Sequence, residues 1–132
     1  MTCILVVDDA SMVRRQVAGA LKTLGYAVIE AFDGVDALAK LDASPDVHLI
    51  MLDIHMPNMN GIEFLERLRA RGSTIPVIVL TAEAEPEVIR RAKELGAKAW
   101  LVKPLKVDLL IATVRKAAPL DAPEDETPAG QT

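Results

Sequence analysis

Acidic, hydroxyl and basic side chains follow four short apolar runs of this sequence, and their types are those of metal and phosphate chemistry. Asp8 and Asp9 follow the first run, Asp53 the third, Thr81 the fourth and Lys103 the fifth. Carboxylates bind hard divalent cations, whereas a lysine amine and a threonine hydroxyl can contact the oxygens of a phosphoryl group. If the fold brings the ends of these runs together, the residues form a site for phosphoryl transfer.

Three carboxylates in one pocket predict a bound cation. If the first and third runs are neighbouring strands, their ends lie about 4.8 Å apart, so Asp8, Asp9 and Asp53 share a pocket. Crowding raises the pKa values of carboxyl groups unless a cation neutralises the site. Mg²⁺ is the predicted ion because it binds a few carboxylates and keeps other positions for water or phosphate oxygens, and Mn²⁺ could replace it. One of the carboxylates could then act as a nucleophile toward phosphorus.

Each residue also has a simpler interpretation. The pair Asp8 and Asp9 could cap the following helix, Thr81 could end a strand, and Lys103 could be a solvated charge. Residues 56–61 are rich in turn-forming types. Only the joint position of the four groups at strand ends favours a site over these separate explanations.

The apolar runs alternate with stretches of helical spacing, which predicts an α/β fold. Nearly continuous apolar runs rich in β-branched residues are typical of parallel strands covered on both faces. Short connections and right-handed crossovers then give an open, doubly wound, five-stranded parallel sheet, a (βα)5 order, with the functional site at the carboxyl ends of the strands. The predicted strands are residues 3–7, 26–31, 47–52, 75–80 and 99–102.

Punctuation residues support this order of elements. Gly25, Gly72 and Gly96 each follow a helical pattern, where a left-handed residue ends a helix at little steric cost. Pro86 suits the first turn of the fourth helix. The second helix, around residues 35–41, is predicted to be the shortest.

Histidine and arginine residues outside the strand ends receive structural interpretations. His48, within the third strand, has no neighbour at a metal-ligand spacing and is predicted to be a hydrogen-bonded strand residue. The arginines on helix faces are predicted to be mainly solvated, and they are Arg14, Arg15, Arg67, Arg69, Arg71, Arg90 and Arg91.

The composition excludes several classes of protein. The chain has 132 residues, of which 51% are hydrophobic and 26% charged, which fits one domain with a core and excludes a disordered chain or a multidomain enzyme. One cysteine and two histidines exclude an internal disulfide and a structural zinc site. The first apolar run, residues 3–7, is too short for a signal peptide or a membrane span, so a cytoplasmic protein is expected.

Charge is uneven along the chain. Four of the 19 acidic residues lie beyond residue 120, so residues 1–120 balance at 15 basic and 15 acidic groups. A neutral body without a basic stripe predicts no direct binding to nucleic acid and no membrane association. The acidic, proline-rich residues 119–132 are predicted to be a flexible tail that follows a domain of residues 1–118.

Four motifs resemble those of the receiver domain of two-component response regulators, and the resemblance extends over residues 2–117. They are Val6-Val7-Asp8-Asp9, Leu52-Asp53-Ile54-His55-Met56-Pro57-Asn58-Met59-Asn60-Gly61, Thr81-Ala82 and Lys103-Pro104, each after a predicted strand. The resemblance implies a flavodoxin-like fold with strand order 2-1-3-4-5.

The resemblance also implies a role for each carboxylate. Asp53 would accept the phosphoryl group. Asp9 and Asp53 would bind Mg²⁺ directly, while Asp8 would act mainly through a bound water. The backbone carbonyl of His55 would complete the protein ligands.

The remaining motif residues would contact the phosphoryl group. Lys103 and the backbone of Ala82 would bind its oxygens, and Thr81 would close on it. The Lys103-Pro104 peptide bond is expected to be cis, which the tertiary amide of proline tolerates.

Three positions vary within the family. Trp100, three residues before Lys103, stands where the family usually has Tyr or Phe. It could turn inward when Thr81 moves, or it could be a core residue of the fifth strand. His55 and Glu83 would flank the path of an attacking water and so set the lifetime of the phosphoryl group, although His55 could equally be an exposed loop residue.

Together these features predict a stand-alone receiver, not an enzyme, which assists its own phosphotransfer and slow autodephosphorylation. A sensor histidine kinase or histidine phosphotransferase would donate the phosphoryl group. The change would reach a downstream protein through the face formed by the fourth helix, fifth strand and fifth helix. The alternatives are a non-phosphorylated pseudo-receiver, a receiver excised from a longer regulator, and a Mg²⁺-dependent phosphohydrolase, which would be expected to carry its nucleophile on the first strand.

Overall fold

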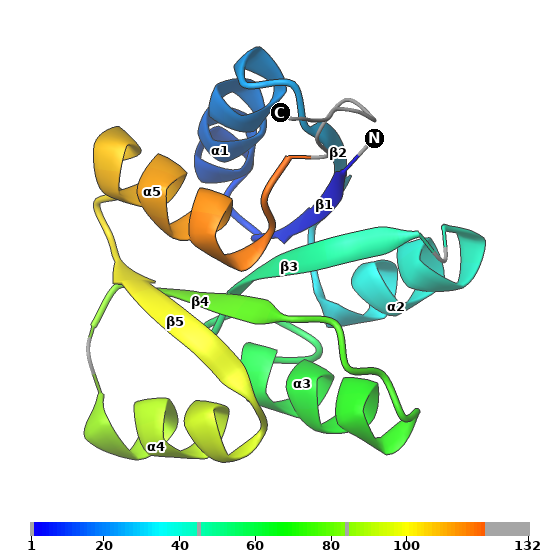
Figure 1. Ribbon diagram of the computed structural model, residues 1–132. Coiled ribbons are helices and arrows are strands. Elements are labelled where there is room, and N and C mark those ends of the chain that lie inside the picture. The colour runs from blue at the N-terminus through cyan, green and yellow to red at the C-terminus, as the bar shows by residue number, and fades with distance from the viewer. Residues whose placement is uncertain (1, 45, 84, 121–132) are drawn as a thin grey trace.

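The computed structural model describes residues 2–44, 46–83 and 85–120, in which five strands alternate with five helices (Figure 1). Each strand is followed by a helix along the chain. The elements are β1 (Cys3–Val7), α1 (Ser11–Thr23), β2 (Ala27–Ala31), α2 (Gly34–Ala43), β3 (Val47–Asp53), α3 (Gly61–Ala70), β4 (Val77–Thr81), α4 (Pro86–Glu94), β5 (Ala97–Val102) and α5 (Val107–Ala117).

All five strands are parallel and form one sheet in the order β2-β1-β3-β4-β5. Helices α1 and α5 cover one face of the sheet, and α2, α3 and α4 cover the other (Figure 1). The predicted doubly wound α/β fold and its flavodoxin-like strand order are therefore confirmed.

Alternate side chains of the central strands supply two separate cores. In β1, Leu5 and Val7 point to the face covered by α2, α3 and α4, whereas Ile4 and Val6 point to the face covered by α1 and α5. Successive side chains of a strand lie on opposite faces, so a strand buried on both faces must be apolar throughout. This explains why the central strands lack the alternation of polar and apolar residues.

Five strand boundaries differ from the prediction, three of them by one residue and the other two by two residues. β4 begins at Val77 instead of residue 75, because Pro76 has no N–H to donate to a ladder, although its carbonyl accepts a bond of 3.0 Å from the amide of Ile50. β5 begins at Ala97, two residues early, directly after Gly96.

The prediction that the second helix is the shortest was wrong. α2 has 10 residues, whereas α4 has 9. α2 begins before its apolar pattern because the side chain of Asp33 accepts a hydrogen bond of 2.8 Å from the amide of Asp36 and so caps the helix.

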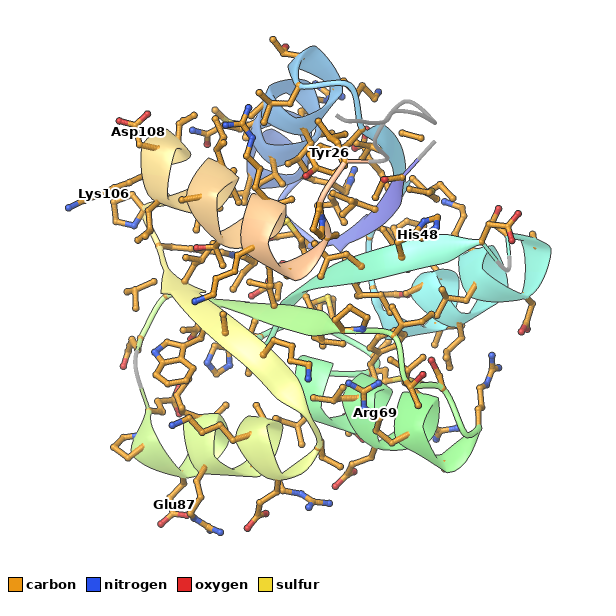
Figure 2. The ribbon with its side chains drawn as sticks, viewed as in Figure 1. Tyr26, His48, Arg69, Glu87, Lys106 and Asp108 are labelled. Atoms are coloured by element: carbon orange, nitrogen blue, oxygen red, sulfur yellow. The ribbon has the colours of Figure 1, made fainter. Side chains whose placement is uncertain are left out.

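The other punctuation residues lie where expected. Gly25, Gly72 and Gly96 follow α1, α3 and α4 with positive φ angles of 99°, 83° and 88°. Pro86 is the first residue of α4. His48 lies on β3 (Figure 2), where its Nδ1 accepts a bond of 3.1 Å from the amide of Cys3 at a shift in strand register.

Arg69 corrects the prediction that the helix arginines are mainly solvated. Arg69 lies on α3 (Figure 2). Its guanidinium is partly buried and donates to the carbonyls of Leu95 at 2.6 Å, Ile75 at 2.9 Å and Ser73 at 3.1 Å. It therefore ties α3 to the end of α4 and the approach to β4, and burial lowers the pKa of this guanidinium.

No helix in the described ranges is long and apolar enough to cross a membrane.

Candidate functional site

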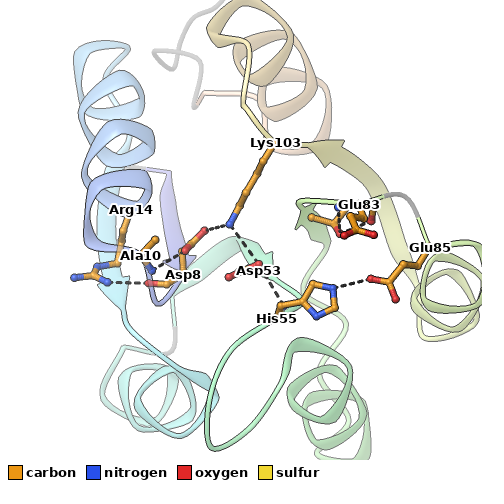
Figure 3. A network of polar contacts seen from close by, with 9 residues as sticks. Asp8, Ala10, Arg14, Asp53, His55, Glu83, Glu85 and Lys103 are labelled. Atoms are coloured by element: carbon orange, nitrogen blue, oxygen red, sulfur yellow. Dashed lines mark hydrogen bonds and ion pairs between the residues drawn. The ribbon is translucent and has the colours of Figure 1, made fainter.

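Parallel pairing brings the ends of β1, β3, β4 and β5 to one edge of the sheet. Val7 pairs with Leu52, and Asp53 pairs with Leu80, so Asp53 lies level with the end of β1. The amide of Lys103 donates a bond of 2.7 Å to the carbonyl of Thr81. The residues predicted from strand ends are thus neighbours in space, as Figure 3 shows for Asp8, Asp53 and Lys103.

Three carboxylates converge at this edge. Oxygen atoms of Asp8, Asp9 and Asp53 all lie within 4.8 Å of one another. Asp8 and Asp53 are buried, and Asp9 is exposed. The Nζ atom of Lys103 lies 2.9 Å from Asp8 Oδ2 and 3.4 Å from Asp53 Oδ1, so one amine serves two buried carboxylates (Figure 3).

The crowding has an electrostatic consequence. Burial first, and the nearby Asp8 second, raise the pKa of Asp53 to about 6, although Lys103 acts in the opposite direction. Burial alone would lower the pKa of Lys103, but its two carboxylate neighbours outweigh that effect and raise it. The cluster therefore favours added positive charge.

The donor atoms fit a hard divalent cation. Asp8 Oδ1 accepts a bond of 2.9 Å from the amide of Ala10, whereas Asp8 Oδ2 is buried and has no hydrogen-bond partner among the described residues. Its charged neighbour is the amine of Lys103, which forms an ion pair with it at 2.9 Å. A buried carboxylate oxygen of this kind matches the all-oxygen ligand preference of Mg²⁺.

Capping of α1 does not explain the two aspartates. The N-cap residue of α1 is Ala10, and no side chain caps this helix. Asp8 bonds the amide of Ala10 itself, which lies outside the helix.

Thr81 lies at the end of β4 and is buried. Its hydroxyl donates a bond of 2.6 Å to the carbonyl of Glu83, within its own loop. Ala82 and Glu83 are exposed. The Lys103-Pro104 peptide bond is cis.

His55 follows Asp53 in the β3–α3 loop and is about half exposed, at 55% of its side chain. Its amide donates a long bond of 3.4 Å to Asp53 Oδ1. Its ring Nε2 lies 2.8 Å from Glu85 Oε2 in the β4–α4 loop (Figure 3). Because an ionised carboxylate can only accept, Nε2 carries the proton of this bond.

The loop after Asp53 is held at several points. Asn58 has a left-handed backbone, with φ of 69°, and its side chain donates a bond of 3.0 Å to Asp33 at the start of α2. The amide of Gly61 donates a bond of 2.8 Å to the carbonyl of Ile54. These bonds turn the chain back directly beneath Asp53, so the segment is more than a solvated turn.

Trp100 is not a core residue of β5. Its side chain is partly exposed, and the Nζ atom of Lys93 lies 4.5 Å from the centre of its ring. With residues of α4 that include Pro86 and Ile89, it lines a groove of about 400 Å³. β5 is an edge strand, so an aromatic side chain there can pack on a helix without complete burial.

Two contributors to the site were missed at the level of sequence. Arg14 donates a bond of 2.8 Å to the carbonyl of Asp8 and another of 3.1 Å to Glu30, so it is not a merely solvated arginine. Its position in the first turn of α1, the helix that follows β1, could have indicated this contact. Glu85 had no local signal, because its bond to His55 joins loops 30 residues apart.

A sequence profile described as the response regulator receiver domain matches residues 4–115. Chemotaxis protein CheY of Treponema pallidum is 42% identical over 118 residues, which cover 86% of this chain and 82% of that protein. The chain belongs to the response regulator receiver domain family.

Some relatives are much longer than this chain. Sensor histidine kinase RcsC of Salmonella typhimurium is 41% identical over 111 residues, and the matched part covers 84% of this chain but 12% of that kinase. The receiver thus spans only about 12% of the length of the RcsC kinases it matches.

Solved structures agree with the family. Chemotaxis protein CheY4 of Vibrio cholerae has a TM-score of 0.83 and 36% identity, and the match covers 89% of this chain and 98% of that one. The receiver domain of NtrX from Brucella abortus has a TM-score of 0.81 and 31% identity over 89% and 99% of the two chains. The chain is thus a CheY-like receiver domain.

Proposed function

We propose that this receiver accepts a phosphoryl group on Asp53 from a phosphohistidine of a sensor histidine kinase or histidine phosphotransferase. The observation that carries the proposal is the convergence of three carboxylates within 4.8 Å at one sheet edge, with the amine of Lys103 against two of them. A capping pair or a solvated lysine would not require this convergence.

The transfer exchanges one bond to phosphorus for another. An oxygen of the Asp53 carboxylate forms a bond to phosphorus, while the bond from phosphorus to the donor imidazole nitrogen breaks. The electron pair leaves with that nitrogen, which takes up a proton. With a pKa of about 6, Asp53 is mostly ionised at neutral pH and is available as the nucleophile.

Lys103 and Thr81 would act on the oxygens of the transferring group. The amine of Lys103 lies 3.4 Å from Asp53 Oδ1 and brings a fixed positive charge to the place where negative charge gathers. The hydroxyl of Thr81 and the backbone amide of Ala82 would donate hydrogen bonds to the same group. The cluster Asp8, Asp9, Asp53 and the carbonyl of His55 would hold Mg²⁺, or Mn²⁺ in its place, which neutralises charge on the phosphoryl oxygens when bound.

The output would be a change of surface that a partner protein reads. The face formed by α4, β5 and α5 exposes apolar side chains, which include Trp100, Val102, Val107 and Leu109. Trp100 would change its orientation when Thr81 moves, and His55 and Glu83 would set the lifetime of the phosphoryl group. We further propose that the protein acts in the cytoplasm, where its kinase would present phosphohistidine.

The test is the intact mass of the protein after incubation with acetyl phosphate, with and without Mg²⁺. The parent is expected to gain one phosphoryl group in Mg²⁺ and almost none in EDTA. Asp53→Asn is expected to gain none under either condition, because the amide nitrogen and oxygen are poor nucleophiles.

Asp42→Asn is the matched control, because it also removes one carboxylate but from the exposed side of α2. It should gain the phosphoryl group like the parent. If the parent gains nothing from acetyl phosphate or from a candidate kinase, the site serves binding only, as in a pseudo-receiver.

A further inference from the structure

The β4–α4 loop is held in a conformation that keeps the Thr81 hydroxyl occupied. Thr81 Oγ1 donates its bond of 2.6 Å to the carbonyl of Glu83, and the amide of Glu85 donates a bond of 3.1 Å to the same carbonyl. A hydroxyl has one proton to donate. Thr81 therefore has to release the Glu83 carbonyl before it can donate to any group on Asp53.

The far end of this loop is fastened to the loop that carries the phosphoacceptor. Glu85 is the N-cap residue of α4, but its side chain bonds no amide of that helix. It reaches instead to His55, with Oε2 2.8 Å from Nε2 (Figure 3). The carboxylate of Glu85 therefore joins two loops instead of capping its own helix.

We propose that Glu85 is a positioning residue, which acts through His55 to hold the β4–α4 loop in the conformation where Thr81 is bonded to Glu83. The bond joins two loops, one following Asp53 and one following Thr81. When it is intact, the Thr81 hydroxyl stays bonded to the carbonyl of Glu83. When it opens, Thr81 and the start of α4 are free to rearrange together.

We call the bond between His55 and Glu85 the latch. The inference rests on the proposed function only for its consequence at Asp53, and the latch itself can be tested without phosphorylation. The probe is the exchange of the Glu83 amide with water, measured by NMR on the protein in EDTA. This amide donates a bond of 3.3 Å to Thr81 Oγ1, so its exchange reports opening of the turn.

His55→Ala is the decisive variant, because it removes the bond without changing any residue of the β4–α4 loop. We expect the exchange of the Glu83 amide to rise about two- to five-fold, as suits one exposed contact between side chains. Glu85→Ala is expected to give the same rise, and the double variant no further rise, because both single variants remove one shared bond. Glu85→Gln keeps an acceptor oxygen and is expected to restore most of the protection.

Glu87→Ala is the matched control. It also removes a carboxylate from the first turn of α4, but this one bonds Arg90 within the helix. It is expected to leave the exchange of the Glu83 amide unchanged. Unchanged exchange in His55→Ala, or additive effects in the double variant, would overturn the latch.

The consequence for signalling is a faster reaction with acetyl phosphate. His55→Ala and Glu85→Ala are each expected to raise the rate constant of phosphorylation about two- to five-fold, and equally, because the freed Thr81 can reach the phosphoryl group more often. Unchanged rates in variants that show faster amide exchange would overturn the link to Thr81. If the parent is not phosphorylated at all, the proposed function fails, while the exchange experiment still decides the latch.

Discussion

At the scale of single residues, the position of Asp53 raises the pKa of its carboxyl group. It is buried beside Asp8, and the single amine of Lys103 does not offset both effects. A carboxyl group with a raised pKa destabilises the folded state when it is ionised. The same environment makes the site receptive to a cation.

The pH dependence of stability follows from this shift. The pKa of Asp53 is about 6 in the folded state against 3.8 for the unperturbed group, so the folded state binds the proton more tightly. Its contribution to stability therefore falls as the pH rises through this window and is lowest above pH 6. Relative to the parent, Asp53→Asn is expected to gain roughly 2 kcal/mol more stability at pH 7.5 than at pH 4.5.

Urea unfolding in EDTA measures this difference at the two pH values. Asp42→Asn, on the surface of α2, controls for the loss of an ordinary carboxylate. An equal gain for Asp53→Asn at both pH values would contradict the raised pKa of Asp53.

At the scale of elements, the start of α3 packs against the backbone at the end of β3, which carries Asp53. Asn60 and Glu63 form a capping box, in which each side chain accepts a bond from the backbone amide of the other. Gly61 is the first residue of α3, directly after Asn60. A Cβ added there would lie 2.5 Å from the carbonyl oxygen of Asp53 and 2.8 Å from Cα of Ile54. The close approach of α3 to the end of β3 therefore requires glycine.

Two glycine substitutions are predicted to have opposite effects. Gly61→Ala is expected to destabilise the fold by about 1–3 kcal/mol, because the neighbouring atoms are backbone and must shift. Gly19→Ala, in the exposed interior of α1, is expected to stabilise by about 0.5–1 kcal/mol, since nothing lies within 4 Å of the added Cβ and alanine favours a helix. Urea unfolding of both variants checks this, and a neutral Gly61→Ala would refute the close approach.

At the scale of the whole molecule, the end of the described chain packs back against its beginning. The Tyr26 hydroxyl is buried and donates a bond of 2.8 Å to the carbonyl of Ala118, and the Thr2 hydroxyl donates a longer bond of 3.4 Å to the carbonyl of Pro119. Burial raises the pKa of Tyr26, and nearby Arg115 offsets part of that effect. These contacts join the segment after α5 to the residues that directly precede β2 and β1.

Loss of the Tyr26 hydroxyl is therefore expected to cost stability. Tyr26→Phe should lower the free energy of unfolding by about 1 kcal/mol, because it leaves a buried carbonyl without its donor. Thr113→Val is the matched control, since it removes a hydroxyl that bonds the Leu109 carbonyl on the exposed face of α5. That variant should stay within about 0.5 kcal/mol of the parent, and equal losses in urea unfolding would contradict the prediction.

The predicted boundary between a domain of residues 1–118 and a tail of residues 119–132 stays a prediction. Residues 121–132 lie outside the described part of the chain. The sequence profile of the family ends at residue 115.

The sequence by itself determined the order of elements and predicted which polar residues lie together at one edge of the sheet. Apolar runs, glycines after helices and the polar residues at four of the five strand ends are local features, and parallel pairing brings strand ends to one edge whatever the details. Asp53 and Thr81 could therefore be assigned to one site before any contact was known. The error at residue 75 came from Pro76, whose missing N–H decides where a ladder can begin.

Only the tertiary structure decided which groups touch across that edge. The bond between His55 and Glu85, the raised pKa of Asp53 and the exposure of Trp100 depend on how loops and helices from distant parts of the chain are placed. Local spacing carries no information about such distances or about burial, because both are set by packing between elements. The residue types at the sheet edge could thus be predicted from the sequence, whereas the raised pKa of Asp53 and the bond between His55 and Glu85 are properties of the folded molecule.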